Sequence, residues 1–137
     1  MRVSIQSSTG AAGTIRTVWR AQNISGKACR SFGYPGMDVR GPHGWLNLHV
    51  IRGGRYGDIN QPPQRIVVAP GHSLYFVSYW VDVTTNTFPV CTPFDRVKVT
   101  LPDNRVSNVL SATGLSNSCL NPDSVHVGPV TTRVPGP

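Results

Sequence analysis

The chain has 137 residues and a formal net charge of +7, and it contains no glutamate. This length suits one domain with a hydrophobic core, and we expect a single domain over residues 1–137. No stretch of about 18 apolar residues is present to span a membrane, and no apolar signal segment follows Met1. The chain is therefore expected to be either an intracellular protein or the mature part of an exported one.

Valine, threonine, serine, glycine and proline dominate, which is typical of strands and turns. Apolar and alternating runs between closely spaced turn signals predict a sandwich of short strands. We expect the core within residues 14–130, with 1–13 and 131–137 as an edge strand or tails. Alternation over residues 14–21 directs Trp19 to the core and Val18 to the solvent.

The later segments continue this pattern along the chain. Residues 102–118 are expected to form a long loop. Further strands are predicted at 45–52, 65–69, 73–83, 96–101 and 124–130.

The run at 73–83 is apolar on both of its predicted faces. Phe76 and Trp80 suit one face, while Tyr75 and Tyr79 make the other face aromatic as well. A sandwich strand normally shows one polar face to water. Either loops cover this second face, or it binds a partner.

If a face of the protein binds something, aromatic and basic residues near this run are the first candidates. Trp45 and His49 are expected to share the outward face of the 45–52 strand, and Arg52–Tyr56 is expected to form a mobile basic loop. The candidate binding face consists of Tyr75, Tyr79, Trp45, His49, Arg52, Arg55 and Tyr56.

The three cysteines are Cys29, Cys91 and Cys119, with no Cys-x-x-Cys pair. The four histidines are scattered, so we expect no metal site. A loop over 102–118 can carry Cys119 back to Cys91, and closing that ring would stabilise the fold by roughly 3–3.5 kcal/mol. Cys29 is then expected to be a small buried residue beside a turn, because no histidine lies near it in sequence to activate a nucleophile.

The motifs of common enzymes are missing. "GLSNS" at 114–118 is not a Gly-x-Ser-x-Gly elbow, and the chain has no phosphate-binding or dinucleotide-binding glycine motif. All six acidic residues are aspartates, and their spacing does not single out a catalytic pair. We expect no catalysis and no cofactor.

Four segments carry a resemblance to a known family. They are an Asn-x-Ser-Gly turn before a cysteine (Asn23, Ser25, Gly26, Cys29), a Gly-Tyr-Pro-Gly turn (33–36), a Pro-Gly turn into an aromatic strand (Pro70, Gly71, Phe76, Trp80), and the two late cysteines. The chain resembles an exported actinobacterial domain family of unknown function, found in secreted proteins and lipoproteins of mycobacteria and streptomycetes. The resemblance implies an immunoglobulin-like antiparallel β-sandwich of about seven to nine short strands. It also implies export, which supports a disulfide between Cys91 and Cys119.

These features favour a non-catalytic secreted or cell-envelope module with a binding or structural role, whose expected partner is a protein or a cell-wall polymer. One alternative is an accessory surface subunit of a filament or virion. Another is a basic domain that binds polyanions, whose affinity would fall steeply with salt. The arginines are spread along the chain and not clustered on one element, so we expect no specific nucleic-acid site.

Overall fold

The computed structural model describes residues 1–84, 86, 89–103, 107–121 and 124–136. The described residues are almost entirely strand, with two single-turn 3-10 helices, η1 (Gly57–Ile59) and η2 (Ala112–Gly114). The strands are β1 (Arg2–Ala11), β2 (Thr14–Gln22), β3 (Cys29–Ser31), β4 (Gly36–Gly41), β5 (Gly44–Leu46), β6 (His49–Arg52), β7 (Ile66–Val68), β8 (Ser73–Val81), β9 (Thr92–Pro93), β10 (Arg96–Thr100), β11 (Ser107–Ser111), β12 (Cys119–Leu120) and β13 (Ser124–Val127).

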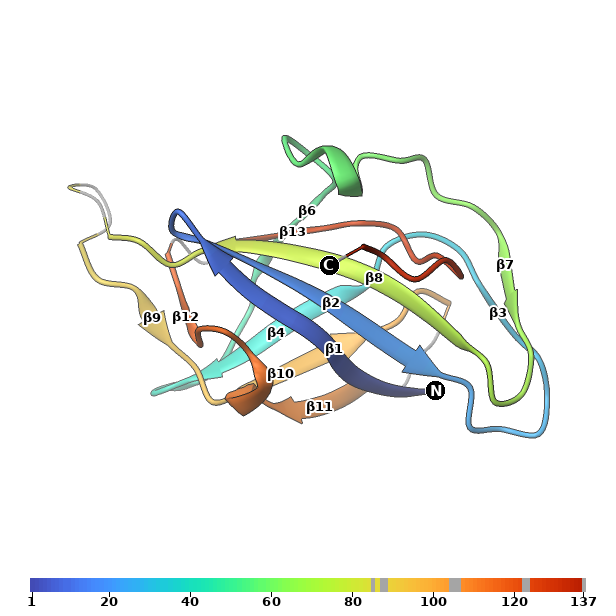
Figure 1. Cartoon of the computed structure of the whole chain (residues 1–137). Coiled ribbons are helices and arrows are strands. Elements are labelled where there is room, and N and C mark those ends of the chain that lie inside the picture. Colours follow the sequence, from blue (N-terminus) through green and yellow to red (C-terminus); the bar gives the residue numbers. More distant parts are fainter. Residues whose placement is uncertain (85, 87–88, 104–106, 122–123, 137) are drawn as a thin grey trace.

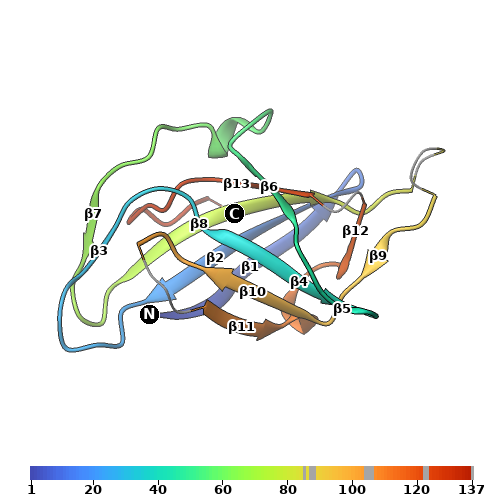
Figure 2. The ribbon, with the colours of Figure 1, turned by 180° about the vertical axis from the view of Figure 1, so that it is seen from behind.

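Two sheets face each other across one core (Figures 1 and 2). The five-stranded sheet has the order β1-β2-β8-β13-β6, and the four-stranded sheet has the order β11-β10-β4-β5. β13 pairs with β6 in parallel, whereas the other strand pairs are antiparallel. The predicted all-β sandwich is confirmed, and its finer immunoglobulin-like character stays a prediction.

Two short ribbons lie at opposite ends of the sandwich (Figures 1 and 2). β3 pairs with β7 at one end, and β9 pairs with β12 at the other. The N-terminal strand β1 pairs along the whole of β2, with a register shift between Ile5 and Ser7. The first residues of the chain are therefore an edge strand of the large sheet.

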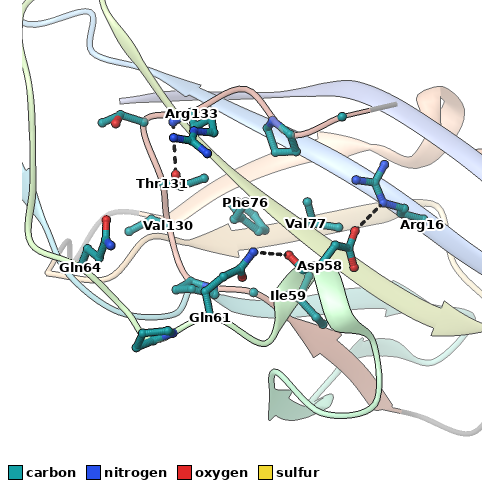
Figure 3. A pocket seen from close by; sticks show the side chains of 16 residues that line it. Arg16, Asp58, Ile59, Gln61, Gln64, Phe76, Val77, Val130, Thr131 and Arg133 are labelled. Atoms are coloured by element: carbon teal, nitrogen blue, oxygen red, sulfur yellow. Dashed lines mark hydrogen bonds and ion pairs between the residues drawn. The ribbon is translucent and has the colours of Figure 1, made fainter.

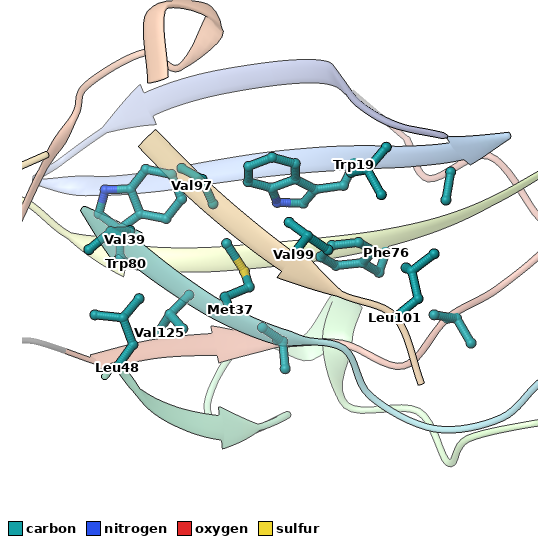
Figure 4. Close-up of a cluster of buried hydrophobic side chains, with 14 of the residues drawn as sticks. Trp19, Met37, Val39, Leu48, Phe76, Trp80, Val97, Val99, Leu101 and Val125 are labelled. Carbon is teal, nitrogen blue, oxygen red and sulfur yellow. The ribbon is translucent and has the colours of Figure 1, made fainter. Parts of the chain in front are cut away.

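Aromatic and β-branched side chains fill the space between the sheets (Figure 4). Trp19 and Phe76 come from neighbouring strands of the large sheet and stack with ring centroids 5.9 Å apart. Val97 and Val99 approach them from β10 and are also buried. The Trp19 indole Nε1 donates a 2.8 Å hydrogen bond to Ser78 Oγ inside this core, so its polar atom is satisfied as burial requires.

Three sequence predictions about strands are wrong. Residues 45–52 do not form one strand, because the chain leaves the small sheet after Leu46 and joins the large sheet at His49. Val18 is buried and not solvent-facing, since a loop covers its side of the sheet. Within 102–118, the part of the chain that the structure describes contains β11 and η2, where a loop was expected.

A disulfide joins Cys91 to Cys119, the pairing expected from the sequence. It closes the end of the sandwich where β9 meets β12, with the two Cα atoms 5.6 Å apart. Cys29 is a free thiol at the start of β3. Cys29 is only half-buried, so the prediction of a buried packing residue is not met. Ser31, two residues later on the same side of β3, is the buried residue of this strand.

We expect Ser78→Ala to lower the free energy of unfolding by about 1–3 kcal/mol, because it leaves the buried Trp19 N–H without an acceptor. Chemical denaturation measures this loss. Ser4→Ala, at an exposed position of β1, should change stability by less than about 0.5 kcal/mol. In a Trp19→Phe background the cost of Ser78→Ala should shrink, and an unchanged cost would mean that the hydrogen bond is not its source.

Replacing both disulfide cysteines, as Cys91→Ser with Cys119→Ser, should lower the free energy of unfolding by roughly 3–3.5 kcal/mol, the chain-entropy value for a ring with a sequence separation of 28. Cys29→Ser serves as the matched control and should cost about 1 kcal/mol or less. Equal losses in the two variants would contradict the stabilising role of the cross-link.

Candidate functional site

The outward face of β2 and β8 carries a second, smaller apolar cluster. Val18 and Val77 lie opposite each other in the strand register, and Ile59 of η1 packs over them. All three side chains are buried. Of the two explanations for the apolar outer face of 73–83, the structure therefore shows that a loop covers its central part.

A polar network fastens that loop to the sheet. The Tyr79 hydroxyl donates to the Asp58 carboxylate, at 2.6 Å and 2.7 Å from its two oxygens. Arg16 Nε donates to the same carboxylate at 2.9 Å and to the Tyr79 oxygen at 3.1 Å. Burial, together with the Asp58 charge, raises the pKa of Tyr79 to about 12, so this phenol stays protonated at neutral pH.

Ring stacking holds the preceding part of the loop. Tyr56 lies parallel to Tyr79 with ring centroids 4.0 Å apart. The Arg55 guanidinium lies over the Tyr56 ring, 5.1 Å from its centroid. His126 meets Tyr56 edge-on, and its Nδ1 lies 2.9 Å from the Gly53 carbonyl oxygen. Gly54 has a φ of +114°, and a Cβ there would come within 2.6 Å of His126, so this turn requires glycine.

Beside the covered cluster lies a groove of about 450 Å³, which we call the outer groove (Figure 3). The loop with η1 forms one wall, and the C-terminal segment 128–136 forms the other. That segment is fixed to the sheet, because Thr131 exchanges two backbone hydrogen bonds with Tyr75 at 2.7 Å and 2.8 Å. Ile59, Phe76, Val77 and Val130 form the base of the groove. Their side chains are almost fully buried, and the Phe76 ring stacks on Trp19 in the core between the sheets.

The rim of the outer groove is polar and carries one unpaired cation. Arg16 and Asp58 lie together at one end, on the far side of Phe76 and Val77 from Arg133 (Figure 3). Arg16 and Asp58 neutralise each other, whereas the Arg133 guanidinium has no ion-pair or hydrogen-bond partner among the described residues. The exposed side chains of Gln61, Gln64 and Thr132 add amide and hydroxyl groups along the rim.

The structure brings together only part of the candidate binding face predicted from the sequence. Tyr75, Tyr79, Tyr56 and Arg55 meet on the outer face of the large sheet, where both β8 tyrosines are half-buried. His49 is exposed on β6 at the far edge of the same sheet.

The remaining predicted residues lie elsewhere. Trp45 belongs to the small sheet, where its ring lies 4.7 Å from the Lys98 ammonium. The expectation that Trp45 and His49 share one strand face is therefore wrong, because β5 and β6 belong to different sheets. Arg52 lies over the ring of Tyr34 at 5.4 Å. The segment 52–56 is held on the sheet by its backbone and rings, contrary to the expected mobile loop.

Sequence analysis missed the residues that build the outer groove. Arg133 was assigned to a tail, and Asp58 and Gln61 lie in a segment without strand periodicity. One signal was present, since a two-faced apolar strand needs a cover and Ile59 is an isolated large apolar residue in a turn-rich stretch. The identity of that cover depends on chain-distant contacts that periodicity does not report.

The described residues contain neither a cluster of metal ligands nor a membrane-spanning helix. No group of three or more histidine, cysteine or acidic side chains in this part of the chain could hold a metal ion. None of the helices that the structure describes is long and apolar enough to cross a membrane.

Tyr79→Phe should remove a pH dependence of stability between about pH 10 and 12. The unfolded phenol loses its proton near pH 10, while the folded one keeps it until about 12. The stabilisation is therefore complete below pH 10 and is lost as the pH rises through 12. At neutral pH the variant should lose about 1 kcal/mol, a value reduced because the group is partly exposed to water.

Denaturation at several pH values and absorbance near 295 nm measure this effect. Wild type should show one tyrosine that ionises late, and Tyr34→Phe should keep that late transition. If the late ionisation persisted in Tyr79→Phe, another tyrosine would be responsible for it.

Comparison with protein families matches residues 1–131 to a family described as Domain of unknown function (DUF4232). Because the match spans nearly the whole sequence, the chain belongs to this family. No curated protein and no solved structure matched the chain.

Proposed function

We propose that this member of the DUF4232 family is a non-catalytic binding module, and that the outer groove takes a small amphipathic anion. One observation carries the proposal: apolar lining residues lie beside the guanidinium of Arg133, which has no ion-pair or hydrogen-bond partner among the described residues. A volume of about 450 Å³ falls within the range of ligand sites, which combine an apolar lining with a few polar groups that fix orientation.

The lining suits a ligand with an apolar body and one carboxylate or phosphate. Pro62 and Pro135 line the groove without being buried, so their rings offer surface for the apolar part. A free guanidinium binds such anions through paired hydrogen bonds, which Arg133 can supply. A carboxylate next to an apolar side chain is also the chemistry of a peptide C-terminus, so the groove is compatible with the protein partner predicted from the sequence.

The polar network beside the groove supports a binding role over a catalytic one. Tyr79 is a protonated hydrogen-bond donor at neutral pH, as an ordinary phenol is, and its raised pKa extends this state to higher pH. Both oxygens of Asp58 accept bonds from Tyr79, and one of them also accepts from Arg16. A general base or nucleophile needs a free lone pair aimed at a substrate, whereas these groups face one another and fasten the wall of the groove.

The proposal includes a secreted or cell-envelope location. The Cys91–Cys119 disulfide supports it, because such cross-links persist in oxidising compartments and are rare in the cytosol.

We test the ligand class with decanoate and its neutral analogue decanol, using isothermal titration calorimetry and NMR shifts of the groove amides. Decanoate should bind at least about tenfold more tightly than decanol, since only the carboxylate engages Arg133. Arg133→Gln should remove that preference and leave decanol binding unchanged.

Arg96→Gln is the matched control, because Arg96 is a half-buried residue of the opposite sheet whose side chain, among the described residues, makes a hydrogen bond only to the Asp95 carbonyl. It should behave as wild type. Equal binding of decanoate and decanol, or shifts confined to residues outside the groove, would overturn the proposed ligand class.

A further inference from the structure

The ribbon formed by β3 and β7 has one buried face and one fully exposed face. Arg30 pairs with Val67 in the ladder, and both side chains point away from the sandwich. The alternate positions Ser31, Ile66 and Val68 are buried. The exposed face, which we call the ribbon face, consists of Ala28, Arg30, Phe32, Arg65, Val67 and Ala69, all of them exposed.

The ribbon face presents large apolar side chains to solvent. Phe32 is 47% exposed and Val67 is 62% exposed. Alternation along β3 puts Phe32 on the same side as Arg30. Ile24, in the turn that leads into β3, is 57% exposed, and the connection from β2 to β3 runs at this end of the molecule (Figure 1). Grouped apolar residues of this kind are uncommon on a free surface and indicate an interaction site.

The same end of the molecule is strongly basic. Arg30 and Arg65 have no ion-pair or hydrogen-bond partner within the part of the chain that the structure describes. The segments 22–37 and 59–81, which supply the ribbon and its flanks, contain no acidic residue. Asp103 lines a hollow of about 240 Å³ together with Arg30 but forms no ion pair with it. The ribbon face therefore combines cations and apolar groups without neutralising charge.

Hydrogen bonds hold this end of the molecule in place. The buried Asn23 side chain donates from Nδ2 to the carbonyls of Lys27 and Val68, at 2.7 Å and 2.9 Å. Its Oδ1 accepts from the backbone N–H and the hydroxyl of Ser25. The turn before β3 is thus tied to β7, and the ribbon is a preformed surface at one tip of the sandwich (Figures 1 and 2).

We propose that the ribbon face docks on an anionic lipid surface. The headgroup region attracts clustered arginines, and the acyl boundary beneath it accepts exposed aromatic and aliphatic side chains. A bilayer accepts both without a shaped pocket, which matches a short flat ribbon at a tip of the molecule. This surface is separate from the outer groove and does not depend on the proposed ligand.

The test is sedimentation of the protein with vesicles of equal parts phosphatidylglycerol and phosphatidylcholine, compared with vesicles of phosphatidylcholine alone. Wild type should bind the anionic vesicles selectively, and rising salt should weaken binding. Arg30→Gln with Arg65→Gln should weaken partitioning by at least about tenfold. Phe32→Ser with Val67→Ser should also weaken it severalfold, because the inserted apolar area is lost.

Arg96→Gln with Val109→Ser is the matched control, since it removes one arginine and one valine of 56% exposure from the small sheet. It should bind as wild type, as should Arg133→Gln. Thermal unfolding checks that every variant is folded. Equal binding to both vesicle types would overturn the proposal. So would normal vesicle binding by the Phe32 and Val67 variant, because the surface would then attract polyanions without entering lipid.

Discussion

The central part of the β2–β8 pair is buried on both of its faces, and this constraint organises the rest of the molecule. Its inner face supplies Trp19 and Phe76 to the core between the sheets. Its outer face carries Val18 and Val77, which would be exposed if the large sheet were bare. Burying apolar side chains stabilises a fold by about 25 cal/mol per Å² removed from water. The second face therefore requires a cover, and Ile59 provides it.

The cover explains why a groove exists. Asp58 fastens the loop with η1 to the large sheet by accepting hydrogen bonds from Arg16 of β2 and Tyr79 of β8. The C-terminal segment approaches from the other direction, where Pro129 lacks the N–H that would continue a ladder along β8. Gly128 and Thr131 donate to β8 on either side of that proline. The two covers do not meet, so the outer groove stays open between them.

Sequence periodicity correctly predicted strands whose burial comes from packing one face on the core between the two sheets. It predicted the strand at 96–101 and the buried face of β8 correctly, because alternation is a local property. It failed at 45–52, where the run is continuous but the chain changes sheets near Leu48. It also failed at Val18, whose burial depends on Ile59, far along the chain. The outer groove shares this limit, since Arg16, Asp58 and Arg133 come from three distant segments.

Some arginines of this arginine-rich chain form ion pairs with aspartates, and others do not. Two ion pairs occur among the described residues, Arg16–Asp58 and Arg40–Asp95, because the chain has only six acidic residues to pair with thirteen basic ones. The Arg16–Asp58 pair fastens one wall of the outer groove, and the Arg40–Asp95 pair lies near the end of β4. Where no ion pair forms among the described residues, as at Arg133 and at Arg30, a guanidinium stays available. An excess of cations that looks evenly spread along the sequence thus becomes two separate amphipathic surfaces in the folded chain, one concave and one flat.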